Sequence, residues 1–271
     1  MRIGIIVRWV NPVIAATVEQ LRAHGATVDF IYPDKVAAPL ANIRVEHDLY
    51  LLKSATPAAF SYAGALHGLG AVTLNPYLTV GLLRNKIVTN RILQAAGVPI
   101  PETFVVPHPT DLAPYLEDGP LIVKPHLGSR GIGIKIVHSA EMLTTLPASN
   151  PTLAQRYHRP DQLDKCDHKL FRIGERVFGV RRVWPIQTYA DKQGEPFEVT
   201  PQLRDITIRC GEAFGRLELY GLDVIISQGQ PYVVDFNKFS SFMGVPNAPQ
   251  LLADIIYEKA QRVLRGEPLL A

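Results

Sequence analysis

The stretch Ile122-Val123-Lys124-Pro125-His126-Leu127-Gly128-Ser129-Arg130-Gly131-Ile132-Gly133 joins an apolar run, a lysine and a glycine-rich loop. Closely spaced glycines let the backbone bend tightly and present N–H groups to an anion. The loop lacks Gly-Lys-Ser/Thr, so it is not a P-loop. A predicted strand follows it at 134–137, whereas a dinucleotide fingerprint needs a helix there. The stretch predicts either a hairpin loop that folds over phosphates or an ordinary hairpin turn.

A second polar pattern lies near the other end of the sequence. Residues 220–227 and 232–237 are predicted strands joined by a turn at Gly229. Asp235 and Asn237 are two positions apart and share a face, which Asp223 reaches from the neighbouring strand. These hard oxygen ligands suit Mg²⁺. The alternative, that the acids only cap strand ends, is less favoured, because unpaired carboxylates within apolar strands are costly.

The rest of the chain reads as a mixture of α/β and α+β structure. Apolar runs at 3–7, 27–32, 49–52 and 72–74 alternate with helical patterns at 12–25 and 56–69, which predicts a small parallel sheet with helices on both faces. A helix is expected at 82–96, followed by a Pro-rich boundary at 98–101. Strand patterns then dominate, with helices predicted at 140–146, 201–214 and 250–264.

Composition excludes several classes of protein. The 271 residues are 47% hydrophobic and 20% charged, which is typical of a globular protein and not of a disordered one. The net charge of +3 is too small to indicate nucleic-acid binding but suits a small anionic ligand. Two cysteines make no disulfide framework, and no apolar run approaches a membrane span. We expect a cytoplasmic protein with neither a nucleic-acid nor a membrane partner.

Taken together and in this order, the motifs resemble the ATP-grasp superfamily over nearly the whole chain. The resemblance implies an ATP-grasp fold preceded by a Rossmann-like pre-ATP-grasp domain. On that basis we expect a pre-ATP-grasp domain at 1–75, a central subdomain with the glycine-rich loop at 76–150 and a C-terminal subdomain with the metal site at 151–271.

The resemblance also implies a nucleotide site for ATP with Mg²⁺ or Mn²⁺. Lys86 and Lys124 match the two lysines that contact the α- and β-phosphates, and residues 153–158 match the strand whose backbone binds adenine. Asn85 and Arg156 depart from the pattern, in which Asp and Glu are usual. The expected nucleotide-binding residues are Lys86, Lys124, Gly128, Ser129, Arg130, Gly131, Gly133, Gln155, Tyr157 and Lys169. The expected metal ligands are Asp223, Asp235 and Asn237.

Two subfamilies compete for the reaction. The glycine loop is similar to that of RimK-type glutamate ligases, whereas the surroundings of Lys53, Lys169 and Lys238 are similar to inositol polyphosphate 5/6-kinases. We favour a carboxylate–amine ligase, with a phosphotransferase acting on a hydroxyl as the alternative and a non-catalytic ATP sensor as a third reading. Lys124 and Arg182 are the expected catalytic residues.

The acceptor is expected to be a small anion, namely an amino acid, a peptide or a phosphorylated metabolite. Its expected contacts are Lys53, Lys169, Arg182 and Lys238. A homodimer is compatible with the resemblance, but no interface is visible in the sequence.

Overall fold

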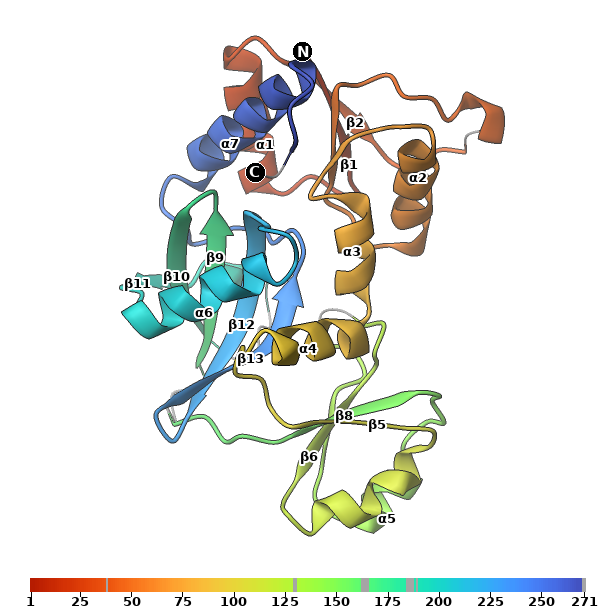
Figure 1. Cartoon of the computed structure of the whole chain (residues 1–271), viewed down its shortest axis with the longest axis vertical. Helices are drawn as coiled ribbons and strands as arrows, with labels where there is room; N and C mark the ends of the chain where they lie inside the picture. Colours follow the sequence, from red (N-terminus) through yellow and green to blue (C-terminus); the bar gives the residue numbers. More distant parts are fainter. Residues whose placement is uncertain (38, 129–130, 162–165, 184–187, 189, 270–271) are drawn as a thin grey trace.

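The computed structural model describes the chain apart from residues 38, 129–130, 162–165, 184–187, 189 and 270–271. The strands are β1 (Arg2–Ile6), β2 (Thr27–Ile31), β3 (Leu49–Leu52), β4 (Thr73–Leu74), β5 (Thr103–Val106), β6 (Leu121–Lys124), β7 (Lys135–Val137), β8 (Thr152–Arg156), β9 (Cys166–Ile173), β10 (Arg176–Val183), β11 (Glu195–Phe197), β12 (Leu219–Ser227) and β13 (Gln230–Asn237). The α-helices are α1 (Pro12–Ala23), α2 (Pro57–Gly68), α3 (Tyr77–Arg84), α4 (Lys86–Ala95), α5 (Ala140–Thr144), α6 (Pro201–Glu212) and α7 (Ala248–Leu264). Short 3-10 helices are η1 (Leu40–Asn42), η2 (Pro109–Leu116) and η3 (Ala190–Lys192). Within this described part the strands form three sheets, arranged along the long axis of the molecule (Figure 1).

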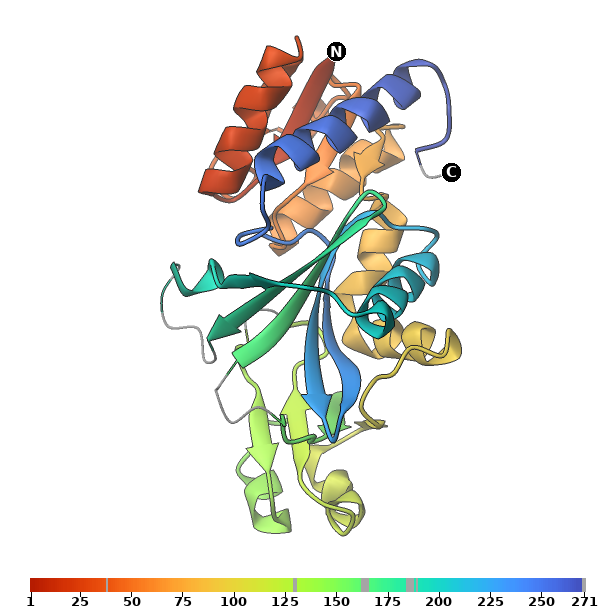
Figure 2. The same ribbon diagram turned by 90° about the vertical axis from the view of Figure 1, so that its left-hand side faces the viewer.

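The N-terminal sheet has the order β2-β1-β3-β4 and is parallel, as the sequence predicts. Helix α1 begins where Asn11 Oδ1 accepts a hydrogen bond from the Ile14 N–H at 2.8 Å, with Pro12 at the first helical position. The α1 side chains Val18 and Leu21 are buried against the sheet, while α2 covers the opposite face. Helix α7 packs beside α1, although more than 200 residues separate them in the sequence (Figure 2).

The single helix predicted over 82–96 is wrong, because two helices, α3 and α4, meet at Asn85. Asn85 has extended backbone angles, φ −100° and ψ 110°, and its Oδ1 accepts a hydrogen bond from the Ile87 N–H at 3.0 Å. An Asn side chain at this point starts a new helix by capping its free N–H groups. The break makes Lys86 the first residue of α4.

The middle sheet, ordered β5-β8-β6-β7, is antiparallel. Strands β6 and β7 flank the glycine-rich loop and pair with each other, with Ile122 opposite Ile136. This confirms the predicted hairpin. The sheet packs on η2 and α5 through a small apolar cluster that includes Leu112 and Leu143.

The largest sheet has the order β11-β10-β9-β12-β13, and its neighbouring strands are antiparallel. Helix α6 covers one face, where Leu170, Leu222 and Ile206 share a core. The other face is apolar at the end near α7 and polar toward the middle sheet. Figure 1 shows α3 and α4 running beside this sheet, between the other two.

The division into segments 1–75, 76–150 and 151–271 stays a prediction. Two structural facts bear on its boundaries. Strand β8, at Thr152–Arg156, follows the boundary at residue 150 but belongs to the middle sheet. Helix α7, which lies in the third segment, packs against the N-terminal unit. None of the described helices combines the length and the apolarity that crossing a membrane requires.

Candidate active site

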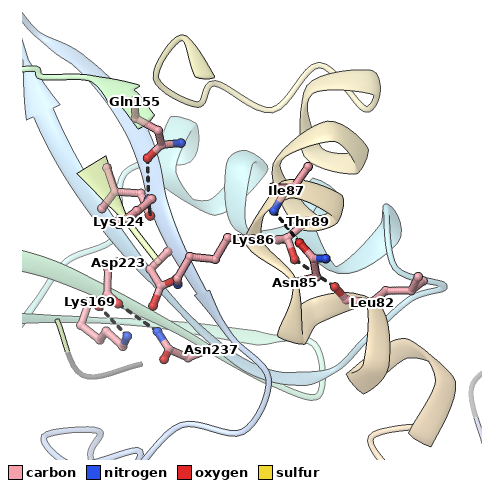
Figure 3. Close-up of polar contacts among 12 residues, drawn as sticks. Leu82, Asn85, Lys86, Ile87, Thr89, Lys124, Gln155, Lys169, Asp223 and Asn237 are labelled. Atoms are coloured by element: carbon pink, nitrogen blue, oxygen red, sulfur yellow. Dashed lines mark hydrogen bonds and ion pairs between the residues drawn. The ribbon is translucent and has the colours of Figure 1, made fainter. Parts of the chain in front are cut away.

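The polar residues singled out near the C-terminal end of the sequence meet on one face of the largest sheet. In the strand register, Asp223 of β12 lies opposite both Lys169 of β9 and Asp235 of β13. Asn237 follows two positions after Asp235, and its Nδ2 donates a hydrogen bond to Asp223 Oδ2 at 2.9 Å. Figure 3 shows Asp223, Asn237 and Lys169 pointing toward one another across these strands. The predicted set of oxygen ligands is therefore assembled in one place.

Each of the two carboxylates is paired with a lysine. Lys86, at the start of α4, forms an ion pair with Asp235. Lys169 Nζ donates a hydrogen bond to Asp223 Oδ1 at 2.5 Å. Burial alone would raise the pKa of Asp235, but the positive charge and the hydrogen bond of Lys86 outweigh it and lower that pKa. The two lysines therefore neutralise the two carboxylates.

Lys124 lies at the end of β6 and reaches the same region from the middle sheet. Its Nζ donates hydrogen bonds to Gln155 Oε1 at 2.6 Å and to the Val234 carbonyl oxygen at 3.0 Å. Burial, with Lys86 nearby, lowers the pKa of Lys124 to about 8. The Gln155 amide is held in turn, since its Nε2 donates to Thr103 Oγ1 at 3.0 Å. The side chain of Gln155 therefore orients Lys124, a role that the sequence did not indicate.

Other predicted nucleotide contacts lie close by. The Tyr157 N–H donates to the Pro120 carbonyl oxygen at 2.9 Å, and the Lys86 N–H donates to that of His126 at 2.9 Å. The second bond joins the base of the glycine-rich loop to α4. The contact of the 153–158 segment with adenine stays a prediction.

The described glycines of the loop adopt conformations that explain their presence. Gly131 has φ +71° and Gly133 has φ +79°, which side-chain-bearing residues rarely adopt. A Cβ on Gly133 would also lie 2.8 Å from Pro125 Cγ. Gly128 precedes them, and Ser129 and Arg130, which were predicted to bind phosphate, lie outside the described residues.

Arg182 of β10 belongs to the same sheet and lies opposite Asp167 of β9 in the strand register. It is 5% exposed, its Nη2 donates to the Met243 carbonyl oxygen at 3.1 Å, and its guanidinium lies 5.3 Å from the centre of the Phe171 ring. These contacts fix a buried cation beside the carboxylates. The position fits the predicted role of Arg182, and no contact in the structure tests that role.

The sequence did not single out Asp167, which belongs to this site. Its Oδ1 is buried and has no hydrogen-bond partner in the described part of the chain. Burial, with the negative charge of Asp223 adding to it, raises the pKa of Asp167 to about 6, although Lys169 and Arg182 partly offset the effect. The available signal was its spacing, since Asp167 precedes Lys169 by two positions and shares its face of the strand.

Lys53 and Lys238, two of the four predicted acceptor contacts, lie at the junction with the N-terminal sheet. Lys53 follows β3, and its Nζ donates to the Phe239 carbonyl oxygen at 3.3 Å. Lys238 follows β13 and lies 5.8 Å from the centre of the Phe60 ring. Burial lowers the pKa of Lys53 to about 8 and that of Lys238 to about 7.

The residues present fit a divalent cation with a polyphosphate. Asp223, Asp235 and Asn237 supply hard oxygen donors on one face, and Lys86 and Lys169 place cations, which attract phosphate, beside them. Among the residues with a described position, no group of three or more His, Cys, Asp or Glu side chains is placed to hold a metal ion. The set consists instead of two carboxylates and an amide, so it leaves coordination positions for phosphate and water.

Comparison with known proteins places these motifs in a wider context. The family model described as "RimK-like ATP-grasp domain" matches residues 83–250. A protein of Trichodesmium erythraeum named "Probable alpha-L-glutamate ligase" is 23% identical over 192 residues, which cover 66% of this chain and 64% of that protein. The "Coenzyme gamma-F420-2:alpha-L-glutamate ligase" of Methanococcus maripaludis is 28% identical over 182 residues, 62% of this chain and 63% of that protein. The matches thus span slightly less than two thirds of both relatives.

Solved structures are similar over almost the whole chain. A RimK domain protein of Sphaerobacter thermophilus, described as ATP-grasp, has a TM-score of 0.74 and 20% identity, with 94% of this chain and 98% of that chain covered. D-alanine–D-alanine ligase from Bacillus anthracis has a TM-score of 0.69 and 18% identity, covering 99% and 100% of the two chains. These similarities confirm the predicted ATP-grasp fold.

Proposed function

This chain belongs to the RimK-like ATP-grasp family, and from that premise we propose that it is an ATP-dependent carboxylate–amine ligase. The observation that carries the proposal is the convergence of Lys86, Lys124 and Lys169 on the Asp223–Asp235–Asn237 set, next to the buried Arg182. The relatives described above are named as glutamate ligases, which favours ligation over transfer to a hydroxyl.

The nucleotide would lie between the middle sheet and the largest sheet. Lys86, Lys124 and Lys169 would bind its phosphate oxygens, and the glycine-rich loop would cover them with backbone N–H groups. Asp223, Asp235 and Asn237 would hold a divalent cation, Mg²⁺ or Mn²⁺, which when bound neutralises charge on the phosphates. The nucleotide contacts would require Lys86 and Lys169 to exchange their carboxylate partners for phosphates.

In this proposal Arg182 would act on the phosphoryl group that is transferred to the acceptor. An acceptor carboxylate oxygen would attack the γ-phosphorus of ATP, releasing ADP and forming an acyl phosphate. An amine would then attack the acyl carbon, so that an amide forms, phosphate leaves and the amine loses a proton. The guanidinium of Arg182, held by Met243 and Phe171, would stabilise the negative charge of the transferring group.

The names of the relatives indicate only the class of substrate. One relative acts on glutamate and a coenzyme by its name, and "Ribosomal protein bS6--L-glutamate ligase" of Shigella boydii, 23% identical over 191 residues, names a protein acceptor. We propose that this chain joins an amino acid, through its amine, to a small anionic or peptide acceptor.

The test is an incubation of the purified protein with MgATP, separate pools of amino acids and short peptides, and a third pool of inositol phosphates. ADP and free phosphate are measured independently. We expect equal amounts of ADP and phosphate, released only when both a carboxylate and an amine are present. ADP without free phosphate, together with a phosphorylated acceptor, would show a phosphotransferase and overturn the proposal.

A further inference from the structure

A small cavity lies between helix α4 and strand β13, next to the ion pair of Lys86 and Asp235. Its volume is about 10 Å³, close to the roughly 10–15 Å³ that one water molecule needs. It is lined by residues of α3, α4, β6 and β13, namely Leu83, Lys86, Thr89, Asn90, Leu93, Lys124, Val233, Val234, Asp235 and Phe236. The lining thus combines members of the apolar core under α6 with residues of the candidate site.

The amide of Asn90 stands out in this lining. Asn90 lies one turn after the start of α4 and is only 8% exposed. Its Nδ2 is buried and has no hydrogen-bond partner in the part of the chain that the structure describes. A buried amide without a partner destabilises the folded state, so native proteins pair such groups with protein atoms or with ordered water. A water molecule in the adjoining cavity would satisfy this amide.

The spacing along α4 connects Asn90 to Lys86. The two residues are four positions apart, so their Cβ atoms lie about 5–6 Å from each other on the same side of the helix. Figure 3 shows the Lys86 side chain reaching from α4 toward the strands of the largest sheet, where it pairs with Asp235. Because all three residues line the cavity, a single water molecule in it is within reach of both the amide and the ion pair.

Strand β13 is irregular where it borders the cavity. Its register against β12 shifts between Asp223 and Val224, which leaves Val234 as an extra residue. The Val234 carbonyl oxygen accepts a hydrogen bond from Lys124 Nζ at 3.0 Å and has a second lone pair for another donor. A donor, the Asn90 amide, and an acceptor, the Val234 carbonyl, therefore both border the cavity.

We propose that Asn90 is a positioning residue that binds one buried water molecule, and that this water holds the Lys86 ammonium in place for the nucleotide phosphates. The water accepts hydrogen bonds from Asn90 Nδ2 and Lys86 Nζ and donates one to the Val234 carbonyl oxygen. Since an ammonium group has three donors, Lys86 keeps the water when it exchanges Asp235 for a phosphate. The inference rests on the proposed function only for the contact between Lys86 and phosphate.

The water is tested first, in the unaltered protein. A high-resolution crystal structure without nucleotide should show one ordered water molecule in the cavity, within hydrogen-bond distance of the Asn90 amide. The same structure of Asn90→Leu, in which an apolar side chain fills the space, should lack that water. An empty cavity in the unaltered protein would overturn the proposal, and this result does not depend on any variant.

A double-mutant cycle then tests the action on Lys86, with MgADP binding measured by calorimetry. Asn90→Leu should weaken MgADP binding about fivefold, whereas in the Lys86→Met background the same change should alter the affinity by less than about twofold. A residue that merely supports the fold would have the same effect in both backgrounds, because its loss does not act through the lysine. Equal effects would therefore overturn the proposal.

The same change at an exposed position is the matched control. Asn42→Leu, in η1, should bind MgADP as the unaltered protein does. Thermal midpoints check that each variant folds. If Asn90→Leu does not fold, Asn90→Ala, which removes the amide and adds no bulk, takes its place in the cycle and is judged by the same comparison.

The two proposals fail in different ways. A protein that shows the water and the coupling to Lys86 but forms no amide with any amine contradicts the ligase and leaves the role of Asn90 standing. A working ligase whose cavity is empty, or whose two substitutions act independently on MgADP binding, contradicts the role of Asn90 alone.

Discussion

Lys169 and Asp223 face each other on neighbouring antiparallel strands, β9 and β12, and the lysine occupies one oxygen of a carboxylate that is an expected metal ligand. Lys86, at the start of α4, forms an ion pair with Asp235, the other carboxylate of the expected metal site. Without nucleotide, a divalent cation must therefore compete with two ammonium groups. This arrangement predicts that cation and nucleotide bind cooperatively, because phosphates draw the lysines away from the carboxylates.

Replacing the lysine should expose this competition. In Lys169→Met, we expect the affinity for Mn²⁺ in the absence of nucleotide to rise several-fold, because Asp223 loses its cationic partner. The affinity for ATP should fall in the same variant. Electron paramagnetic resonance of free Mn²⁺ during titration measures the first effect, and Lys135→Met is the control. Unchanged Mn²⁺ binding would contradict the competition.

Removing a predicted ligand should stop turnover. In Asn237→Ala, the amide oxygen is lost and Asp223 Oδ2 loses its hydrogen-bond donor, so we expect ATP turnover to fall to background, as in Asp235→Ala. A coupled ADP assay at saturating MgATP measures the effect. Asn42→Ala, at an exposed position in η1, should behave as the unaltered protein. Full turnover from Asn237→Ala would rule out the metal assignment.

Asp167 should make stability depend on pH. Its pKa is raised from 3.8 to about 6 on folding, mainly by burial, so the folded state holds a proton more tightly than the unfolded state. The contribution of Asp167 to stability should therefore fall as the pH rises from about 4 to about 6, by on the order of 2 kcal/mol.

The variant Asp167→Asn removes that titration, so its stability should change less over this range and exceed that of the unaltered protein at pH 7.5. Urea unfolding at several pH values measures the difference. Asp118→Asn, whose parent side chain is 82% exposed, is the control. Parallel curves for the unaltered protein and Asp167→Asn would contradict the prediction.

A buried ion pair should matter more than an exposed one. Lys259 of α7 is paired with Glu218 at 2.6 Å, with the two side chains 3% and 19% exposed. Lys259→Met leaves the Glu218 carboxylate without its partner, so we expect a loss of about 3–5 kcal/mol in unfolding free energy. Replacing both residues by Met should recover most of it.

The control is the exposed pair of Arg22 and Glu19, whose side chains are 48% and 71% exposed. Arg22→Met should cost less than about 1 kcal/mol. Urea denaturation provides both numbers, and equal losses at the two positions would contradict the role of burial.

Local patterns in the sequence were sufficient for much of the fold. The parallel sheet, the hairpin around the glycine-rich loop and the shared face of Asp223, Asp235 and Asn237 follow from apolar runs and from the alternation of side chains along strands. These features depend on neighbours in the sequence or on two adjacent strands, so pattern and spacing indicate them directly.

Two features escaped this reasoning for physical reasons. The break at Asn85 depends on a side-chain cap that interrupts an otherwise continuous helical pattern. Strand β9 begins at Cys166, before the apolar run at 170–173. Its first part shows no apolar pattern, because Asp167 and Lys169 place polar groups on the face that lines the candidate site. A strand that lines an active site loses the apolar signal that marks other strands, so Asp167 was missed.

The packing of α7 on α1 has a consequence for the order of synthesis. The apolar side of the N-terminal sheet needs both helices to be covered, but α7 is encoded near the opposite end of the chain. While a ribosome makes the intervening residues, the part of that side that α7 covers remains open to water or to a chaperone. The unit that is translated first is thus among the last to be completed.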